Sequence, residues 1–262
     1  MLKNERAKTM TDFMKKIKSA EYKSIFIVLI WLFVWQLISV TVHNKVLLVG
    51  PVETVGALSK MFLTEEYRSS IAFSLMRIIG GFFLGSILGI LLAWASYRVK
   101  MIEDFLEPAI LVLKAVPVAS FVILLLIWAG NKILAFYISM LVVLPVLYLN
   151  TLGGLKATDV KLLEMAEVFR MPSLRRIRYI YMPSVYPYLR TGLQMALGMA
   201  WKSGVAAEVI GQPLGSMGNG LYQAKIYLET AELFAWTISI IFVSFLMEKA
   251  VLIVMDKTLG RG

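Results

Sequence analysis

Residues 155–190 form a polar stretch, LKATDVKLLEMAEVFRMPSLRRIRYIYMPSVYPYLR, between two long apolar runs. The stretch contains seven Lys or Arg residues and three acidic residues, so its balance is strongly basic. A basic segment between apolar runs is typical of a cytoplasmic loop of a membrane protein. We therefore predict a membrane protein in which this loop folds into a surface that binds a soluble partner.

The composition of the whole chain supports a membrane protein. Of its 262 residues, 59% are apolar and 17% are charged, and the mean hydropathy is +0.75. Soluble domains have about 45–50% apolar and about 25% charged residues. The net charge of +10 would suit nucleic acid, but the basic residues flank apolar runs, so membrane topology explains them more simply. The absence of cysteine and the single histidine exclude disulfides, thiolate chemistry and a metal site rich in Cys or His.

Six apolar segments are long enough to cross a bilayer core of about 30 Å as helices. We predict an all-α membrane protein with one transmembrane domain over 24–256. The first segment has no small-residue cleavage site after it, so we interpret it as a span and not as a signal peptide. The spans are expected at about 24–42, 71–95, 105–128, 133–152, 187–210 and 232–255, after an interfacial helix or disordered basic tail at 1–23 and before a tail at 257–262.

The distribution of Lys and Arg along the chain indicates its orientation. Six spans place both termini on the same side of the membrane. The segments on that side hold nineteen Lys and Arg residues, and the segments on the other side hold five. Because cytoplasmic segments are enriched in Lys and Arg, we expect the 155–190 loop and both termini to be cytoplasmic.

Small residues recur every four positions in two of the predicted spans. Small residues at this spacing let another helix approach closely, so we expect each row to pack against a neighbouring helix. Proline should bend the third span at Pro117 and interrupt the fourth at Pro145. The two rows are Gly81, Gly85 and Gly89 in the second span, and Gly192, Ala196, Ala200 and Gly204 in the fifth.

Two short helices are expected within the 155–190 loop. Thr158 or Asp159 can cap the first, over about 160–169, and the sequence Arg-Met-Pro at 170–172 then breaks it. The second begins near Ser173 and ends at the prolines that precede the fifth span, Pro183 and Pro187. Two such helices at the membrane face would make a docking surface. An ordinary basic loop is the alternative.

The loop also resembles a motif of a known family. Glu164-Met165-Ala166, followed at the family's interval by Ile180-Tyr181-Met182-Pro183, is similar to the EAA loop of binding-protein-dependent ABC importer permeases. That loop contains Glu-Ala-Ala-x-x-x-Gly and, further on, Ile-x-Leu-Pro. Here Met165, Arg170 and Met182 replace the first Ala, the Gly and the Leu.

Arg170 is the replacement with the clearest structural consequence. Glycine adopts a positive φ freely, whereas arginine does so only at a cost. We therefore expect either an altered turn at Arg170 or an arginine that itself contacts the partner. A family-like turn with Arg170 exposed and unpaired would contradict both versions.

The resemblance covers about 190 residues, from about 65 to 256. It implies a type I ABC importer permease fold in which a coupling helix at about 164–169 enters a groove of a cytoplasmic ATPase. The segments that are similar to permeases of the sulfonate, taurine and nitrate branch are 105–130, 145–166, 186–211 and 218–224. The residues expected to couple to the ATPase are Asp159, Leu163, Glu164, Ala166, Glu167, Phe169, Arg170, Met171, Pro172 and Pro183.

The resemblance also implies a set of partners. The chain lacks the phosphate loop G-x-x-x-x-G-K-[ST], so ATP and Mg are expected on a separate ATPase dimer, and no enzymatic activity or bound cofactor or metal is expected here. The other expected partners are a second permease copy, an extracytoplasmic binding protein that delivers the solute, and the lipid of a bacterial inner membrane. Nucleic acid is not an expected partner.

Polar residues inside the predicted spans are candidates for lining the solute path, because such residues are costly unless they face water, protein or solute. Two lysines in each chain would suit a small organic anion, although structural pairing or snorkelling is the alternative. Lys202 and Glu208 lie too far apart along the helix for a simple ion pair. The candidates are Lys114, Pro117, Lys202, Ser203 and Glu208.

Two other functional classes compete with the importer permease. The first is a secondary transporter or channel that works without an ATPase, although the spans show no inverted repeat and few acidic residues. The second is a membrane-embedded enzyme. Its weakness is that the spans contain no paired carboxylates, no His/Asp metal cluster and no Ser/His arrangement.

Overall fold

The computed structural model of the chain describes residue 23 and residues 25–258, and this part contains helices and no strands. The all-α prediction is therefore confirmed for the described residues. They belong to two compact units. The smaller unit comprises Met1–Met61 and Ala224–Ala235, and the larger unit comprises Phe62–Gln223 and Trp236–Gly262. The interfacial segment predicted at 1–23 lies outside the described residues except for Lys23.

The smaller unit contains the first predicted span as a helix, Ile25–Val42. A second helix, α2, runs over Pro51–Phe62 and begins at a proline. Proline suits the first position of a helix, because the backbone N–H that it lacks would have no helical partner there. Trp35 joins the first helix to the segment before α2, because its Nε1 donates a hydrogen bond to the Val49 carbonyl at 3.0 Å.

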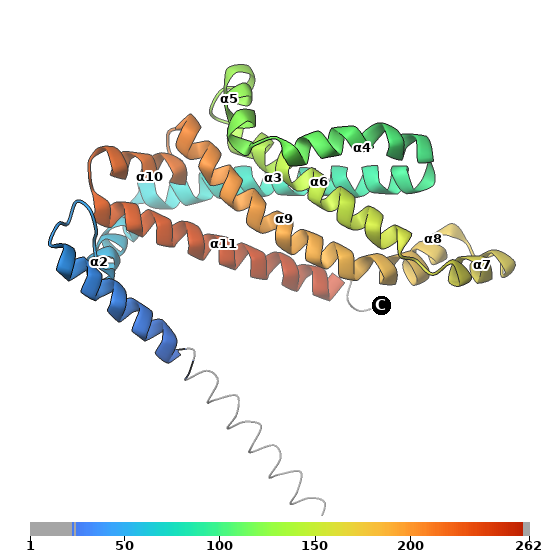
Figure 1. Ribbon diagram of the computed structural model, residues 1–262, viewed down its shortest axis with the longest axis horizontal. Coiled ribbons are helices and arrows are strands. Elements are labelled where there is room, and N and C mark those ends of the chain that lie inside the picture. The colour runs from blue at the N-terminus through green and yellow to red at the C-terminus, as the bar shows by residue number, and fades with distance from the viewer. Residues whose placement is uncertain (1–22, 24, 259–262) are drawn as a thin grey trace, which may run out of the picture. The chain divides into compact units, whose positions relative to one another are not determined.

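The larger unit is built on long helices that run between two ends, which Figure 1 marks by α7 and by α10. We call these the α7 end and the α10 end. The long helices are α3 (Glu65–Arg98), α4 (Lys100–Ala115), α5 (Val118–Ala129), α6 (Leu134–Lys156), α9 (Met182–Gly211) and α11 (Thr230–Thr258). The short ones are α7 (Val160–Val168), α8 (Ser173–Arg176) and the π-helix Ile177–Tyr181 at one end, and the start of α10 (Met217–Ile226) at the other.

α6 is the central helix of the larger unit, because both rows of small residues pack against it. A Cβ at Gly85 of α3 would lie 2.6 Å from the Met140 carbonyl oxygen. On α9, a Cβ at Gly192 would lie 2.8 Å from the Cβ of Asn150. No larger side chain fits at these distances, so α3 and α9 reach α6 only through small residues. The prediction that each row has a close helix partner is confirmed.

Proline bends the third predicted span as expected. α4 ends at Ala115 and α5 begins at Val118, and the two helices differ in direction by 100°. Pro117 has no N–H for a helical hydrogen bond and keeps Val116 in extended backbone, with ψ 129°. The third span is therefore two helices joined at a sharp bend.

Proline does not interrupt the fourth or the fifth predicted span. Pro145 lies inside a continuous α6, so the interruption predicted there is wrong. α9 begins at Met182, before Pro183 and Pro187, so the helix starts ahead of the span predicted from 187. Pro183 lies where the π-helix passes into α9 and the pattern of helical hydrogen bonds changes, and Pro145 is buried in a helix that its neighbours stabilise.

Five of the six predicted spans satisfy a test of length and composition among the described residues. Ile25–Val42, α3, α6 and α11 pass singly, and α4 with α5 passes as one broken span. α9 does not pass, although its 30 residues exceed the length that a bilayer requires. It carries Lys202 and Glu208 and packs one side on α6, so less of its surface needs to be apolar. Membrane crossing by α9 stays a prediction.

Candidate docking surface and solute path

α7 has the cap that the loop sequence predicts. It runs from Val160 to Val168, and the carboxylate of Asp159 accepts a hydrogen bond from the Lys161 N–H at 2.9 Å. An aspartate at this position satisfies a free backbone donor and places negative charge at the positive end of the helix dipole. Of the two candidates, Asp159 and not Thr158 is the cap.

Arg170 ends α7 in a left-handed turn, with φ +49°. Its N–H donates to the Glu167 carbonyl at 2.9 Å, and the Met171 N–H donates to the Ala166 carbonyl at 2.8 Å. These two bonds form a Schellman motif, in which glycine is the usual left-handed residue. The altered turn expected at Arg170 is therefore wrong, because arginine adopts the conformation that glycine favours.

The Arg170 side chain is exposed and has no partner within residues 25–258. This combination contradicts both versions of the Arg170 expectation, because the turn is family-like and the side chain is exposed and unpaired in the described part of the chain.

Three apolar side chains near this turn are strongly exposed. Val168 and Phe169 are 79% and 76% exposed, and Leu174 in α8 is 82% exposed. Ala166 is fully buried, so α7 has a packed face as well as an open one. Exposed apolar side chains in a group are typical of a surface that binds another protein. We call Val168, Phe169 and Leu174 the α7 surface.

The other residues predicted to couple to the ATPase lie on both sides of this surface. Pro172 precedes α8 as its N-cap residue. Pro183 is exposed in the first turn of α9, separated from α7 by α8 and the π-helix. On α7 and the turn after it lie Glu164 and Glu167, which are exposed, and Leu163 and Met171, which are partly buried.

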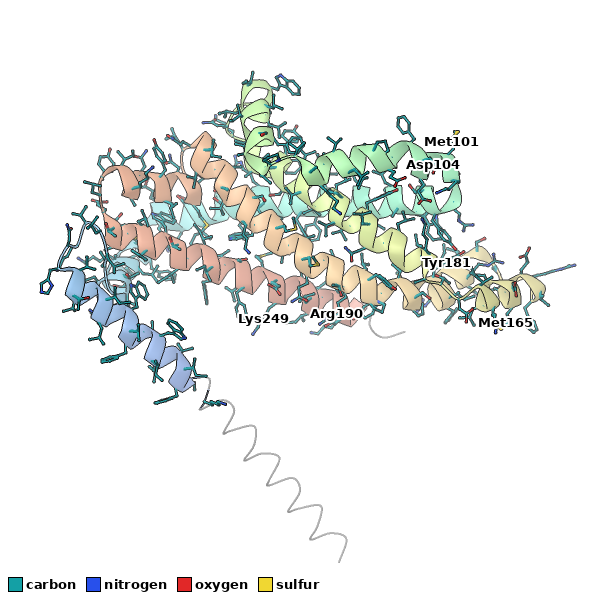
Figure 2. The ribbon with its side chains drawn as sticks, viewed as in Figure 1. Met101, Asp104, Met165, Tyr181, Arg190 and Lys249 are labelled. Carbon is teal, nitrogen blue, oxygen red and sulfur yellow. The ribbon has the colours of Figure 1, made fainter. Side chains whose placement is uncertain are left out.

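A buried aromatic residue fastens the loop to α3. The ring of Tyr181, at the end of the π-helix, has its centroid 5.4 Å from that of Trp94 and 5.7 Å from that of Tyr97, both edge-on. Figure 2 labels Tyr181 where the loop joins the long helices. Edge-to-face pairs of this kind stabilise packing beyond the burial of their area. The Ile-Tyr-Met-Pro motif therefore holds the loop on the bundle.

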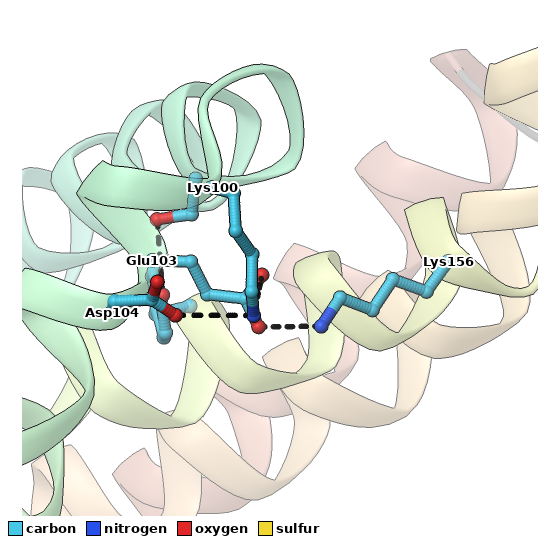
Figure 3. Close-up of polar contacts among 6 residues, drawn as sticks. Lys100, Glu103, Asp104 and Lys156 are labelled. Atoms are coloured by element: carbon cyan, nitrogen blue, oxygen red, sulfur yellow. Dashed lines mark hydrogen bonds and ion pairs between the residues drawn. The ribbon is translucent and has the colours of Figure 1, made fainter.

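A cluster of charged side chains fixes the place where the chain leaves α6 for α7 (Figure 3). Lys156, the last residue of α6, lies 2.5 Å from Glu103 of α4, and Lys100 lies 3.2 Å from both Glu103 and Asp104. Glu103 precedes the span predicted at 105–128, and the hydrogen bond from Lys156 lowers the pKa of its carboxyl. The cluster ties α4 to α6, so α7 starts from a fixed point.

The structure places two lysines of the predicted solute path in exposed positions on different helices. Lys114 lies in the last turn of α4 and Lys202 in α9, and neither has an ion-pair partner within residues 25–258. Pro117 is exposed at the bend, and Ser203 is partly buried. A cleft of about 310 Å³ between α4 and α6 has Lys114 and Glu107 in its lining.

Glu208, the fifth predicted path residue, is fully buried at the α10 end. Its Oε2 accepts hydrogen bonds from the Ser74 hydroxyl at 2.7 Å and from the Gly218 N–H at 3.2 Å. The described residues contain no ion pair between Lys202 and Glu208, as their spacing predicts. Sequence reasoning missed Ser74 and Gly218, because neither residue type signals a contact between distant segments.

Comparison with known proteins identifies the family. The profile of the family described as "Binding-protein-dependent transport system inner membrane component" matches residues 85–256. The chain belongs to this family. The family is the membrane permease component of ABC importers, in which a separate subunit hydrolyses ATP, so this permease is not itself an enzyme. An ATPase and a substrate-binding protein are therefore among its partners.

Several curated proteins are similar to this permease over most of their length. A Bacillus subtilis protein named as an aliphatic sulfonates transport permease, SsuC, is 30% identical, with 77% of this chain and 74% of that protein aligned. The nitrate import permease NrtB of Synechococcus elongatus is 28% identical, over 74% and 73%. The taurine transport permease TauC of Escherichia coli is 27% identical, over 71% and 68%. The resemblance to this branch is confirmed.

Proposed function

We propose that this permease imports a small, anionic organic solute and that α7 is the helix through which a cytoplasmic ATPase drives transport. The observation that carries the proposal is the α7 surface: apolar side chains more than three-quarters exposed at the end of the capped helix α7 and on the neighbouring α8. Burying such a side chain in a partner contributes about 1.5–3 kcal/mol. In an ABC importer permease, the ATPase is the partner expected to cover it.

The anchoring of the loop supports a mechanical role for α7. The Lys156–Glu103 pair holds the start of the loop on α4, and Tyr181 holds its end on α3. A displacement of α7 would therefore be transmitted to the long helices at both points. Closure of two ATPase subunits around bound ATP and Mg would move two such loops together and switch the path between its outward and inward states.

The assembly that we propose contains two copies of this permease, because each chain has one loop and an ATPase dimer offers two grooves. Both termini and the α7 end would face the cytoplasm, and the α10 end would face the binding protein. The excess of Lys and Arg at the α7 end supports this orientation. Lipid of the bacterial inner membrane would cover the apolar outer faces of the spans.

The chemistry of the two exposed lysines supports an anionic solute. Lys114 and Lys202 lie in predicted spans without an ion-pair partner in the described part of the chain. A lysine at membrane depth normally faces water, protein or solute. The names of the three relatives specify anions or a sulfonate zwitterion, which fits the same chemistry. Pro117 would place Lys114 at the bend of the path, and Ser203 would supply a hydroxyl beside Lys202.

The test of this proposal is uptake by the reconstituted assembly. The permease, its ATPase and its binding protein are placed in liposomes, and uptake of alkanesulfonates, taurine and nitrate is measured with and without ATP. We expect uptake that requires ATP and the binding protein and that is lost in Glu164→Lys. Glu66→Lys is the control for a charge reversal outside the loop, because Glu66 is exposed in the first turn of α3. Full uptake without the ATPase would contradict the proposal and favour a secondary transporter or channel.

The role of the lysines is tested in the same liposomes. Lys114→Gln and Lys202→Gln should each lower uptake about tenfold, the effect of losing about 1.4 kcal/mol of interaction with the anion. Lys132→Gln is the control, because Lys132 lies between α5 and α6 and outside the predicted spans. Equal uptake by all three variants would exclude the two lysines from the path.

A further inference from the structure

The polar network around Glu208 joins three helices at the α10 end. The Met217 N–H donates to the Ser74 hydroxyl at 2.9 Å, and that hydroxyl donates to Glu208 Oε2 at 2.7 Å. The Gly218 N–H donates to the same oxygen at 3.2 Å. The first two backbone N–H groups of α10, which have no partner within the helix, therefore donate to one serine of α3 and one glutamate of α9. Negative charge is stabilising at this end of a helix.

The contact between α9 and α10 is too close for any side chain at Gly218. A Cβ there would lie 2.7 Å from the carbonyl carbon of Glu208 and 2.7 Å from the nitrogen of Val209. Met217 and Glu208 are fully buried, and Ser216 is almost so. The start of α10 thus lies inside the larger unit and not on its surface, so it is part of the packing at the α10 end.

One oxygen of this carboxylate is left without a partner. Glu208 Oε1 is buried and accepts no hydrogen bond within the described residues. The nearby cation, Arg77, donates instead to the Lys132 carbonyl and lies over the Phe73 ring. A residue that only had to hold α10 in place would not need to be a glutamate with one unsatisfied oxygen. A neutral side chain could accept the same two hydrogen bonds.

The segment that carries α10 has turns at which it could move. Gln212, directly after α9, has φ +48°, and Gly215, two residues before α10, has φ +73°. A non-glycine residue in the left-handed region is held there by its surroundings. Gln212 caps α9, because its N–H donates to the Glu208 carbonyl at 2.7 Å, so Gly215 is the turn that could change without altering α9 once the contacts of the Glu208 carboxylate are released.

We propose that Glu208 is a positioning residue for transport: with Ser74 it docks the start of α10 against α3 and α9, and undocking opens the α10 end to the solute. This inference rests on the proposed importer function. In its ionised form, Glu208 makes the docked position favourable through the N-terminus of α10. The unpaired Oε1 keeps the docked position from being so stable that ATP-driven movement cannot release it.

The first test uses the absence of cysteine from the chain. Met217→Cys introduces a single thiol at a fully buried position next to Gly218. In the reconstituted assembly, a membrane-impermeant maleimide should label this thiol slowly without ATP. Trapping with ATP and vanadate should speed labelling. Asn219→Cys, at a partly buried position, is the second reporter if Met217→Cys lowers the yield of assembled complex.

The same reporter measures the contribution of the network. Glu208→Gln should speed labelling without ATP about tenfold, because it removes the charge from the helix N-terminus. Ser74→Ala should act in the same direction. Glu66→Gln and Ser69→Ala are the matched controls, since both positions are exposed in the first turns of α3. Unchanged labelling in Glu208→Gln would overturn the inference.

A second readout separates positioning from simple stability. A structural role alone would lower uptake and ATP hydrolysis together as less complex assembles, and the solute moved per ATP would stay constant. We expect this ratio to fall in Glu208→Gln while hydrolysis persists. A constant ratio would contradict the inference. If the wild-type assembly shows no ATP-dependent uptake, the proposed function fails, whereas the labelling experiment still reports whether Glu208 docks α10.

Discussion

The two ends of the larger unit differ in which side chains they expose and which they bury. At the α7 end, the capped helix α7 exposes Val168, the turn after it exposes Phe169, and α8 exposes Leu174. Arg170 holds a left-handed turn there that suits glycine. At the α10 end, the polar groups of Glu208 and Ser74 are buried and bonded to α10. The first end leaves apolar groups without cover, and the second hides charge and backbone donors.

The difference indicates where each end finds its partner. Outside the predicted spans, where no lipid covers them, exposed apolar side chains are stabilised when another protein covers them, so the α7 end is incomplete in a single chain. Buried polar groups must find their hydrogen bonds within the chain, so the α10 end is nearly complete. Substitutions at the α7 end should therefore change binding, and substitutions at the α10 end should change folding or gating.

Tyr181→Ala should have the largest effect, and it should lower both the stability of the permease and its binding to the ATPase. Tyr181 belongs to the α7 end, yet it is buried against Trp94 and Tyr97. Truncating a buried aromatic side chain costs about 3–5 kcal/mol of stability. Denaturation in detergent should show this loss, and ATPase binding should weaken as well. Tyr181→Phe keeps the ring, so near wild-type stability is expected; an equal loss would mean that the ring contacts are not the cause.

Gly218→Ala should lower the stability of the permease without changing the affinity of the ATPase for correctly folded protein. The added Cβ would meet the backbone of Glu208 and Val209, which cannot move aside as a flexible side chain could. Overpacking of this kind costs about 1–3 kcal/mol. The control is Gly198→Ala, because a Cβ at Gly198 has nothing within 4 Å. If the control is the less stable variant, the close approach at Gly218 is not what limits stability.

Phe169→Ala should have the converse effect. The ring is 76% exposed, so its removal should leave the melting temperature of the permease unchanged. Binding of the ATPase should weaken by about 2 kcal/mol, or about 30-fold, if the ring is a hot spot of the interface. Affinity is measured with purified ATPase in detergent. Phe105→Ala removes an equally exposed ring from α4 and is expected to bind normally.

Arg170→Gly should have the smallest effect, and it should stabilise the end of α7, whereas the three changes above lower stability or binding. Glycine relieves a left-handed residue at a cost of about 1–2 kcal/mol, part of which is offset by the greater freedom of glycine in the unfolded chain. Amide hydrogen exchange should show slower local opening at the end of α7. Arg170→Ala serves as the comparison, because it removes the guanidinium but keeps the Cβ. Weaker ATPase binding in both variants would indicate a contact by the arginine itself.

The sequence predicted most of the elements and fewer of the contacts. Five of six spans, the bend at Pro117, the α7 helix and its Asp159 cap depend on patterns within one segment. The interruption at Pro145 was wrong, and α9 continues through Pro183 and Pro187, because packing on neighbouring helices decides whether a helix continues through proline. The altered turn at Arg170 was wrong because the two hydrogen bonds at the end of α7 hold the turn.

The sequence alone determined the membrane class, the polar loop and the family, since hydropathy, charge distribution and motif order are properties of the chain read in order. Only the tertiary structure decided that α6 is the helix that both small-residue rows pack against, and that Tyr181 fastens the loop to α3. It also showed that Glu208, a candidate for the solute path, is buried and bonded to Ser74 of α3 and to the first turn of α10. Each of these contacts joins residues far apart in the chain, and local patterns carry no information about which distant residue will be the neighbour.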